Sequence, residues 1–130
     1  RTLPTEDPAA VLEEYRQALA DLSAAQPGVR AEIEQVVSLV WGLDSPREAP
    51  VVQAALAAVQ SVTGRAVEPV GAPYGTNGSR YWGIARIPCV VLGPGDIAQA
   101  HTENEWIALE QLEASVEVYT ALARQFGKKG

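Results

Sequence analysis

Apolar residues recur every three or four positions near the start of the chain, which predicts an amphipathic helix over residues 8–26. Asp7 is placed to cap its first turn, and Pro8 suits the first helical position, where a missing N–H costs nothing. Residues 27–28, Pro-Gly, end the helix. The apolar stripe of this helix comprises Val11, Leu12, Tyr15, Leu19 and Leu22.

After residue 28 the apolar residues recur at every second position. Val29, Ala31 and Ile33 alternate with charged residues, which predicts a half-exposed strand. Residues 36–41 continue it after a phase slip near Gln35, where a bulge is expected. Residues 44–50 (DSPREAP) hold two prolines and three charges and predict a hinge between domains.

Two further helices and two further strands follow the hinge. One helix ends at Gly64, and the other ends before Gly127. Residues 67–70 predict a short strand, and residues 87–92, apolar at successive positions, predict a buried one. The stripe of the first of these helices is Val52, Leu56, Val59 and Val62, and that of the second is Leu112, Val116, Tyr119, Ala123 and Phe126.

Composition narrows the class of protein. The 130 residues are 47% hydrophobic and 20% charged, which indicates a globular chain. The net charge of −6 disfavours nucleic-acid binding, and the apolar run at 87–92 is far too short to cross a membrane. The lone Cys89 excludes an internal disulfide and is interpreted as a small core residue. The opening RTLP lacks a leader and suggests a piece of a longer chain.

One segment, residues 87–106, combines a predicted strand with candidate chemistry. A Gly-Pro-Gly turn follows the strand, and His101, the only histidine, is followed by Glu103, Asn104 and Glu105. Sites of α/β proteins gather where strands end, and an imidazole near carboxylates has the chemistry of a metal ligand. A surface histidine in a polar loop is the alternative.

Residues 74–80, YGTNGSR, form a second candidate. Their backbone amides and hydroxyls would cradle a carboxylate or another oxyanion, with Arg80 adding positive charge. An ordinary Asn-Gly turn is the alternative.

Three segments together resemble the zinc-dependent exopeptidase and deacylase family, which includes acetylornithine deacetylase, succinyl-diaminopimelate desuccinylase and the glutamate carboxypeptidases. They are RTLPTEDP at 1–8, GTNGSR at 75–80 and IPCVVLGPGDIAQAHTENEW at 87–106. The resemblance covers essentially the whole chain.

The resemblance implies an α/β fold class: part of a ferredoxin-like dimerisation and lid domain, followed by the C-terminal α/β portion of a catalytic domain. Residues 1–43 would be the second half of the dimerisation and lid domain, 44–50 the hinge, and 51–130 the C-terminal part of the zinc-hydrolase catalytic domain.

The resemblance also implies roles for individual residues. His101 corresponds to a zinc ligand, Gly75 and Thr76 to a pair that approaches substrate, and Arg1 to an arginine that holds a substrate carboxylate. Many relatives have Asp soon after the Gly-Thr pair, whereas residues 77–78 are Asn-Gly here. None of the catalytic residues of the family, and none of its other zinc ligands, falls within this chain.

The predicted function is therefore the C-terminal portion of a zinc-dependent amidohydrolase that cleaves an amide bond in an N-acyl amino acid or small peptide. The full-length family uses two zinc ions, so this chain alone is expected to be inactive. We expect a cytoplasmic homodimer or self-associating chain with no nucleic-acid or membrane partner. The alternative is a stand-alone, non-catalytic α/β binding or assembly module that retains the family scaffold.

Overall fold

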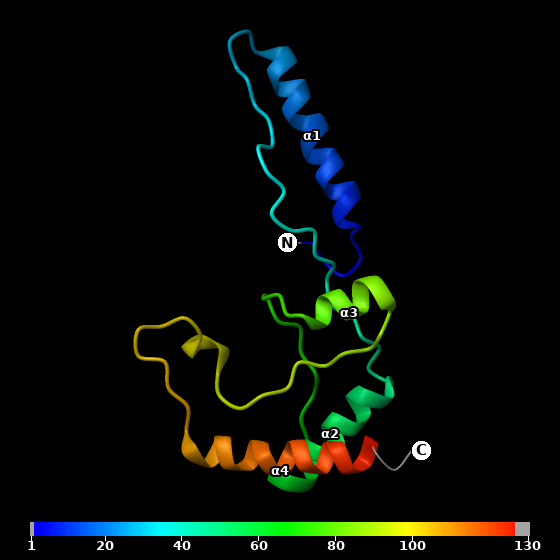
Figure 1. Cartoon of the computed structure of the whole chain (residues 1–130), viewed down its shortest axis with the longest axis vertical. Helices are drawn as coiled ribbons and strands as arrows, with labels where there is room; N and C mark the ends of the chain where they lie inside the picture. Colours follow the sequence, from blue (N-terminus) through cyan, green and yellow to red (C-terminus); the bar gives the residue numbers. More distant parts are fainter. Residues whose placement is uncertain (1, 127–130) are drawn as a thin grey trace. The chain divides into compact units, whose positions relative to one another are not determined.

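A computed structural model describes residues 2–126 and divides the chain into two compact units. The first unit takes residues up to Asp44 together with Tyr74–Ile87. The second takes Ser45–Pro73 together with the residues from Pro88 onward. Helices α1 and α3 belong to the first unit, and helices α2 and α4 to the second (Figure 1).

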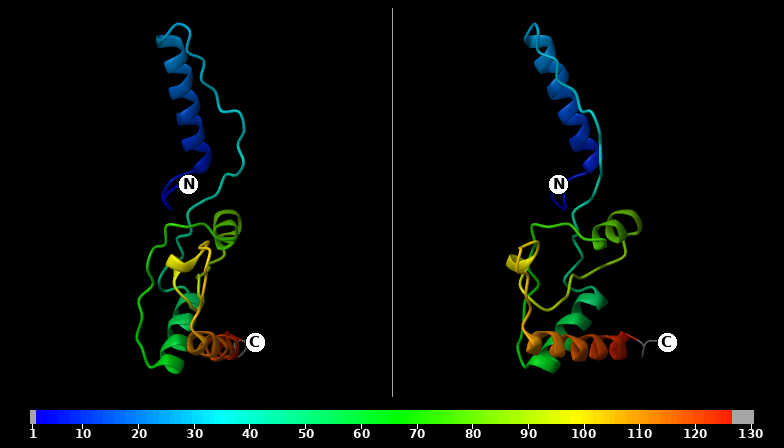
Figure 2. Two further views of the ribbon diagram at one scale, coloured as in Figure 1. Left: turned by 90° about the vertical axis from the view of Figure 1, so that its left-hand side faces the viewer. Right: turned by 60° about the vertical axis from the view of Figure 1, so that its left-hand side comes forward.

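Helix α1 spans Pro8–Ala25, as its periodicity predicted. The Asp7 side chain accepts a hydrogen bond from Ala9 N at 2.8 Å, and Pro8 occupies the first turn, so both predicted start signals are confirmed. The extended segment 29–41 runs back alongside α1 (Figures 1 and 2). Ala31 N fastens it there by donating to Ser23 Oγ at 3.1 Å.

Helix α3 spans Gly78–Ala85 and was not predicted. The side chain of Trp41 packs against its Gly83: a Cβ placed on Gly83 would stand 2.7 Å from Trp41 Cε3. The Arg86 guanidinium lies over the Trp82 ring, 5.5 Å from its centroid. The short helix α3 is therefore in contact with an aromatic side chain from a distant part of the sequence.

The second unit is built on helices α2, Pro50–Thr63, and α4, Leu109–Phe126, with a short 3₁₀ helix η1, Ile97–Gln99, between them in sequence. Gly64 ends α2 with a φ of 69°, as predicted. Helices α2 and α4 pack on each other (Figure 2). Their small side chains allow this close approach, and the buried ones are Val52, Ala55, Ala58 and Val118.

The predicted apolar stripe of α4 is largely exposed. Leu112 and Val116 are 45% and 63% exposed, whereas Val118 is buried. Helix α4 therefore carries apolar residues on two faces, of which one packs on α2. The predicted stop at Gly127 lies outside the described residues.

The α/β fold class, with its ferredoxin-like portion and its α/β catalytic portion, is wrong for this structure. Residues 2–126 contain helices and extended segments but no strand. The predicted strands at 29–33, 36–41, 67–70 and 87–92 are extended but form no ladder. The predicted burial of the last one also fails, since Ile87 and Val91 are 51% and 49% exposed.

The physical reason is that a strand needs a neighbour whose backbone takes its hydrogen bonds, and side-chain alternation does not specify that neighbour. Side chains take several of these bonds instead. Thr2 Oγ1 donates to Val40 O at 3.0 Å. Cys89 N donates to Ser45 Oγ at 2.7 Å, and Cys89 is half-buried and not the full core residue that we expected.

The two units part between Asp44 and Ser45, inside the segment where the composition predicted a hinge. Residues 74–87, however, cluster with the first unit. Whether 1–43 and 51–130 correspond to parts of a lid domain and a catalytic domain stays a prediction.

Candidate functional site

His101 sits at the third position of a tight turn over residues 99–102. Ala100 has φ −61° and ψ 131°, and His101 has φ 64°. Thr102 N closes the turn by donating to Gln99 O at 3.3 Å. These values are those of a type II β-turn, whose third position normally holds Gly or Asn.

A histidine in this position carries a conformational cost. The left-handed region costs a residue with a Cβ roughly 1–2 kcal/mol. Such residues persist where the surrounding structure over-determines them, and they cluster at functional sites. Among the described non-glycine residues, His101 shares a positive φ only with Arg86. The turn holds the His101 side chain exposed to solvent, where it is able to reach a ligand.

The loop before His101 is set by its glycines and by α4. Gly95 adopts φ 91°, which a side chain would disfavour. A Cβ on Gly95 would meet the Ile107 side chain at 3.9 Å, just before α4 begins. The chain thus bends at residues 94–95, within the predicted Gly-Pro-Gly turn, and Gly93 lies beside the Tyr119 hydroxyl of α4.

The carboxylates predicted to accompany His101 are exposed. Glu103 and Glu105 both lie on the surface of the loop that follows the turn. Across the described residues, no group of three or more His, Cys, Asp or Glu side chains gathers to hold a metal ion. This part of the chain therefore offers one imidazole and no complete metal centre.

The second candidate, the loop before α3, lies in the first unit. Gly75 is exposed, and a Cβ there would meet nothing within 4 Å. Thr76 is half-buried; its hydroxyl accepts from Gly78 N at 3.2 Å and its carbonyl accepts from Ser79 N at 3.1 Å. These two amides are therefore engaged in starting α3, and among the described residues no acceptor is found for the Thr76 hydroxyl hydrogen.

Arg1, the third predicted substrate contact, lies outside the described residues. Arg80 is exposed on α3. The predicted site residues are thus distributed over both units, with Gly75 and Thr76 in the first and His101 in the second.

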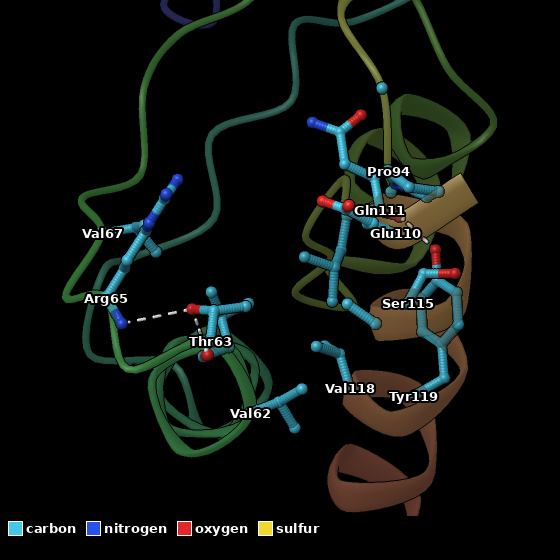
Figure 3. A pocket seen from close by; sticks show the side chains of 15 residues that line it. Val62, Thr63, Arg65, Val67, Pro94, Glu110, Gln111, Ser115, Val118 and Tyr119 are labelled. Atoms are coloured by element: carbon cyan, nitrogen blue, oxygen red, sulfur yellow. Dashed lines mark hydrogen bonds between the residues drawn. The ribbon is translucent and has the colours of Figure 1, made fainter. Parts of the chain in front are cut away.

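A pocket of about 540 Å³ lies in the second unit between α2, the glycine turn and α4 (Figure 3). Val62 and Val118 face it from the two helices, and Tyr119 stands at the glycine turn (Figure 3). Its lining includes neither His101 nor Thr76, and its charged members are Arg65 and Glu110. Most of its remaining walls are apolar.

An ion pair joins two exposed side chains of the second unit, Arg47 and Glu68. The hydrogen bond from Arg47 lowers the pKa of the Glu68 carboxyl and raises the pKa of the guanidinium. Both side chains are more than half exposed, so this pair contributes little to stability.

The sequence did not single out Asp96 and Thr102, which bracket the turn at His101. Asp96 Oδ1 accepts from Ala98 N at 2.9 Å and caps η1. Thr102 Oγ1 donates to Gln99 O at 2.8 Å. An Asp two residues before the capped amide is a recognisable signal, whereas a type II turn with His in place of Gly is not.

Comparison with known proteins identifies the class. A profile of peptidase family M20/M25/M40 matches residues 7–125. The chain is also 32% identical over 114 residues to an acetylornithine deacetylase of Edwardsiella ictaluri (strain 93-146), a match covering 88% of this chain and 27% of that relative. No solved structure matches.

The chain therefore belongs to peptidase family M20/M25/M40, a family of hydrolases that are generally metal-dependent, and the predicted family resemblance is confirmed. It spans about a quarter of the length of the curated relative that it matches. Within the described residues, no helix combines the length and the apolar character that crossing a membrane requires.

Proposed function

We propose that this chain works as a segment of a longer zinc-dependent amidohydrolase that cleaves the amide bond of an N-acyl amino acid or small peptide. The observation that carries the proposal is the turn at His101. This chain belongs to the family, and its only histidine is exposed and adopts a disfavoured positive φ. The same histidine occupies the position that the resemblance gives to a zinc ligand.

The residues present fit this role in part. A neutral imidazole is a common zinc ligand, and His101 is exposed and presented by a hydrogen-bonded turn. Bound zinc would polarise the scissile carbonyl and lower the pKa of a bound water. The contribution of His101 is to supply one ligand nitrogen at a fixed place. Closing a four-ligand site requires side chains from beyond the described residues.

The match to about a quarter of the acetylornithine deacetylase supports the view that the remaining ligands and the general base belong to the rest of a longer protein. On this proposal two zinc ions are bound in the whole enzyme, and this chain supplies one ligand and no catalytic acid or base. Residues 1–130 alone are therefore expected to be inactive.

Substrate contacts would come from the first unit. The Thr76 hydroxyl hydrogen is available to donate to a carboxylate, and Gly75 leaves room for a ligand to approach the backbone. Arg1 would pair with a substrate carboxylate through its guanidinium. These groups favour a substrate that carries a carboxylate, which an N-acyl amino acid does.

Self-association is proposed for the first unit. Val37 of the extended segment is 86% exposed, and Tyr15 of α1 is 64% exposed. We infer that these side chains contribute to an apolar surface that a second copy covers, since large exposed apolar patches mark protein–protein contact sites. Sedimentation velocity should show concentration-dependent dimerisation that Val37→Glu weakens and that Val70→Glu, at an equally exposed site in the second unit, leaves intact. A strictly monomeric chain at high concentration would contradict this.

The activity is tested on the complete protein that contains this chain. The enzyme would be assayed against a panel of N-acetyl, N-succinyl and N-formyl amino acids and dipeptides, before and after chelation. We expect hydrolysis that chelation abolishes and that zinc restores. Persistent absence of hydrolysis in a folded, zinc-loaded protein would instead favour the non-catalytic module.

A further inference from the structure

The turn at His101 is held from both sides by hydrogen bonds of neighbouring residues. On the N-terminal side, Asp96 caps η1, and Ala100 N donates to Ile97 O at 3.0 Å as η1 ends. On the C-terminal side, both the amide and the hydroxyl of Thr102 donate to Gln99 O. Hydrogen bonds therefore constrain the backbone on both sides of His101.

The Thr102 hydroxyl supplies the shorter of the two bonds that close the turn. Its distance to Gln99 O is 2.8 Å, against 3.3 Å for the Thr102 amide. Because Gln99 O accepts both, removing the hydroxyl leaves the turn closed by the longer amide bond alone. Histidine occurs at positive φ more often than most residues, but that conformation still costs energy for a residue with a Cβ, so His101 would then relax toward negative φ more readily.

A change in φ at His101 redirects its Cα–Cβ bond and therefore its imidazole. A metal ligand tolerates little such error, since ligand distances and angles at zinc are narrowly defined. Partners that orient a ligand without touching the metal typically change metal affinity when they are removed.

We propose that Thr102 is a positioning residue for His101, and that Asp96 supports the same turn from its other end. This inference rests on the proposed function, namely that His101 is a zinc ligand. Thr102 acts through its bond to Gln99 O, which fixes the backbone of His101, and it makes no contact with the metal.

The experiment compares Thr102→Val with Thr102→Ser in the complete enzyme. Valine keeps the branched shape and removes the hydroxyl, whereas serine keeps the hydroxyl. Thr120→Val is the matched control, because the Thr120 hydroxyl makes the same kind of bond, to Val116 O at 2.8 Å, within α4. Zinc affinity is measured by competition with a chelator, and the backbone geometry at His101 by the intraresidue amide–Hα NOE, which is strong at positive φ.

Thr102→Val should lower zinc affinity about 10–100-fold and weaken the NOE at His101. Thr102→Ser should restore most of both, and Thr120→Val should change neither. Asp96→Ala is the second variant and should lower zinc affinity in the same direction, whereas Asp96→Asn keeps an oxygen acceptor and should not. A merely structural Thr102 would lower the unfolding midpoint and leave the zinc affinity of the folded enzyme unchanged, which would overturn the inference.

His101→Ala separates this inference from the proposed function. If zinc affinity falls with His101→Ala but is unchanged by Thr102→Val and by Asp96→Ala, the inference fails and the proposed function stands. If His101→Ala leaves zinc affinity unchanged, the proposed function fails, and the inference fails with it.

Discussion

The hydroxyl of Tyr119 donates a hydrogen bond to the carbonyl oxygen of Leu92 at 2.9 Å. Tyr119 lies in α4, and Leu92 is the last residue before the glycine turn that leads toward His101. A Cβ on Gly93 would stand 3.7 Å from the same hydroxyl. The start of the loop is therefore anchored to the longest helix of its unit by one side chain.

Tyr119→Phe should loosen that loop while preserving α4. The ring remains, and the loss is one hydrogen bond, worth about 1 kcal/mol in a typical protein. We expect faster amide hydrogen exchange across residues 93–100 and little change within the helix. Tyr15→Phe in the first unit is the control, because no hydrogen bond of the Tyr15 hydroxyl exists among the described residues. Unchanged exchange in the loop of Tyr119→Phe would show that the bond is not an anchor.

Gly83→Ala should destabilise the first unit, against the usual preference of helices for alanine. A new Cβ would lie 2.7 Å and 2.8 Å from two atoms of the Trp41 ring. Overpacking of this kind costs about 1–3 kcal/mol, which exceeds the roughly 1 kcal/mol that alanine gains over glycine in a helix. Hydrogen exchange of the α3 amides measures the effect.

Gly71→Ala is the control for that substitution, since a Cβ at position 71 meets nothing within 4 Å. It should leave protection unchanged. A more stable α3 in Gly83→Ala would show that Trp41 moves aside at no cost.

Replacing Arg47 should change the pKa of the Glu68 carboxyl, because the two side chains form an ion pair. Arg47→Gln removes the hydrogen bond and the positive charge, so the pKa of the Glu68 carboxyl should rise toward its ordinary value. Because the folded-state pKa is lowered, the pair favours the folded state above the unfolded pKa, and this contribution is lost as the pH falls through the folded pKa.

An NMR titration of the Glu68 carboxyl carbon measures this pKa. Arg65→Gln is the control and should leave it unchanged, and high salt should weaken the effect of Arg47 because the pair is exposed. Equal pKa values with and without Arg47 would mean that the pair does not form in solution.

The helices could largely be predicted from the sequence because their signals are local. Asp7, Pro8 and Gly64 act on neighbouring backbone groups, and each does in the structure what its residue type predicts. Helix α3 was missed because Gly78 and Gly83 lower its helix propensity, and its support comes from Trp41, which is distant in sequence.

The strand predictions were wrong because the pairing of strands, unlike the start and end of a helix, is not a local property of the sequence. Alternation at Val29, Ala31 and Ile33 predicts which side of an extended segment is apolar, but pairing requires a partner that no local pattern specifies. For the site, the resemblance pointed to His101, whereas the turn that holds it was invisible because Gly is absent from its third position. The roles of Gly75, Thr76 and Arg1 stay predictions.

The conformation of His101 predicts a ranking of substitutions. Asparagine tolerates the left-handed region, whereas a β-branched residue does not. His101→Val should therefore be about 1–2 kcal/mol less stable than His101→Asn, measured by denaturant unfolding of the chain. Equal stabilities would mean that residue 101 does not hold its positive φ in solution.

The role of His101 as a zinc ligand is tested most directly by measuring the zinc content and zinc affinity of the complete enzyme with His101→Ala. We predict that this variant stays folded, because an exposed loop side chain contributes little packing. It should bind zinc far more weakly and lose turnover by orders of magnitude. Glu103→Ala, two residues further along the same loop, should keep both the zinc affinity and the turnover. A folded His101→Ala enzyme with unchanged zinc affinity and turnover would contradict the proposal that His101 is a zinc ligand.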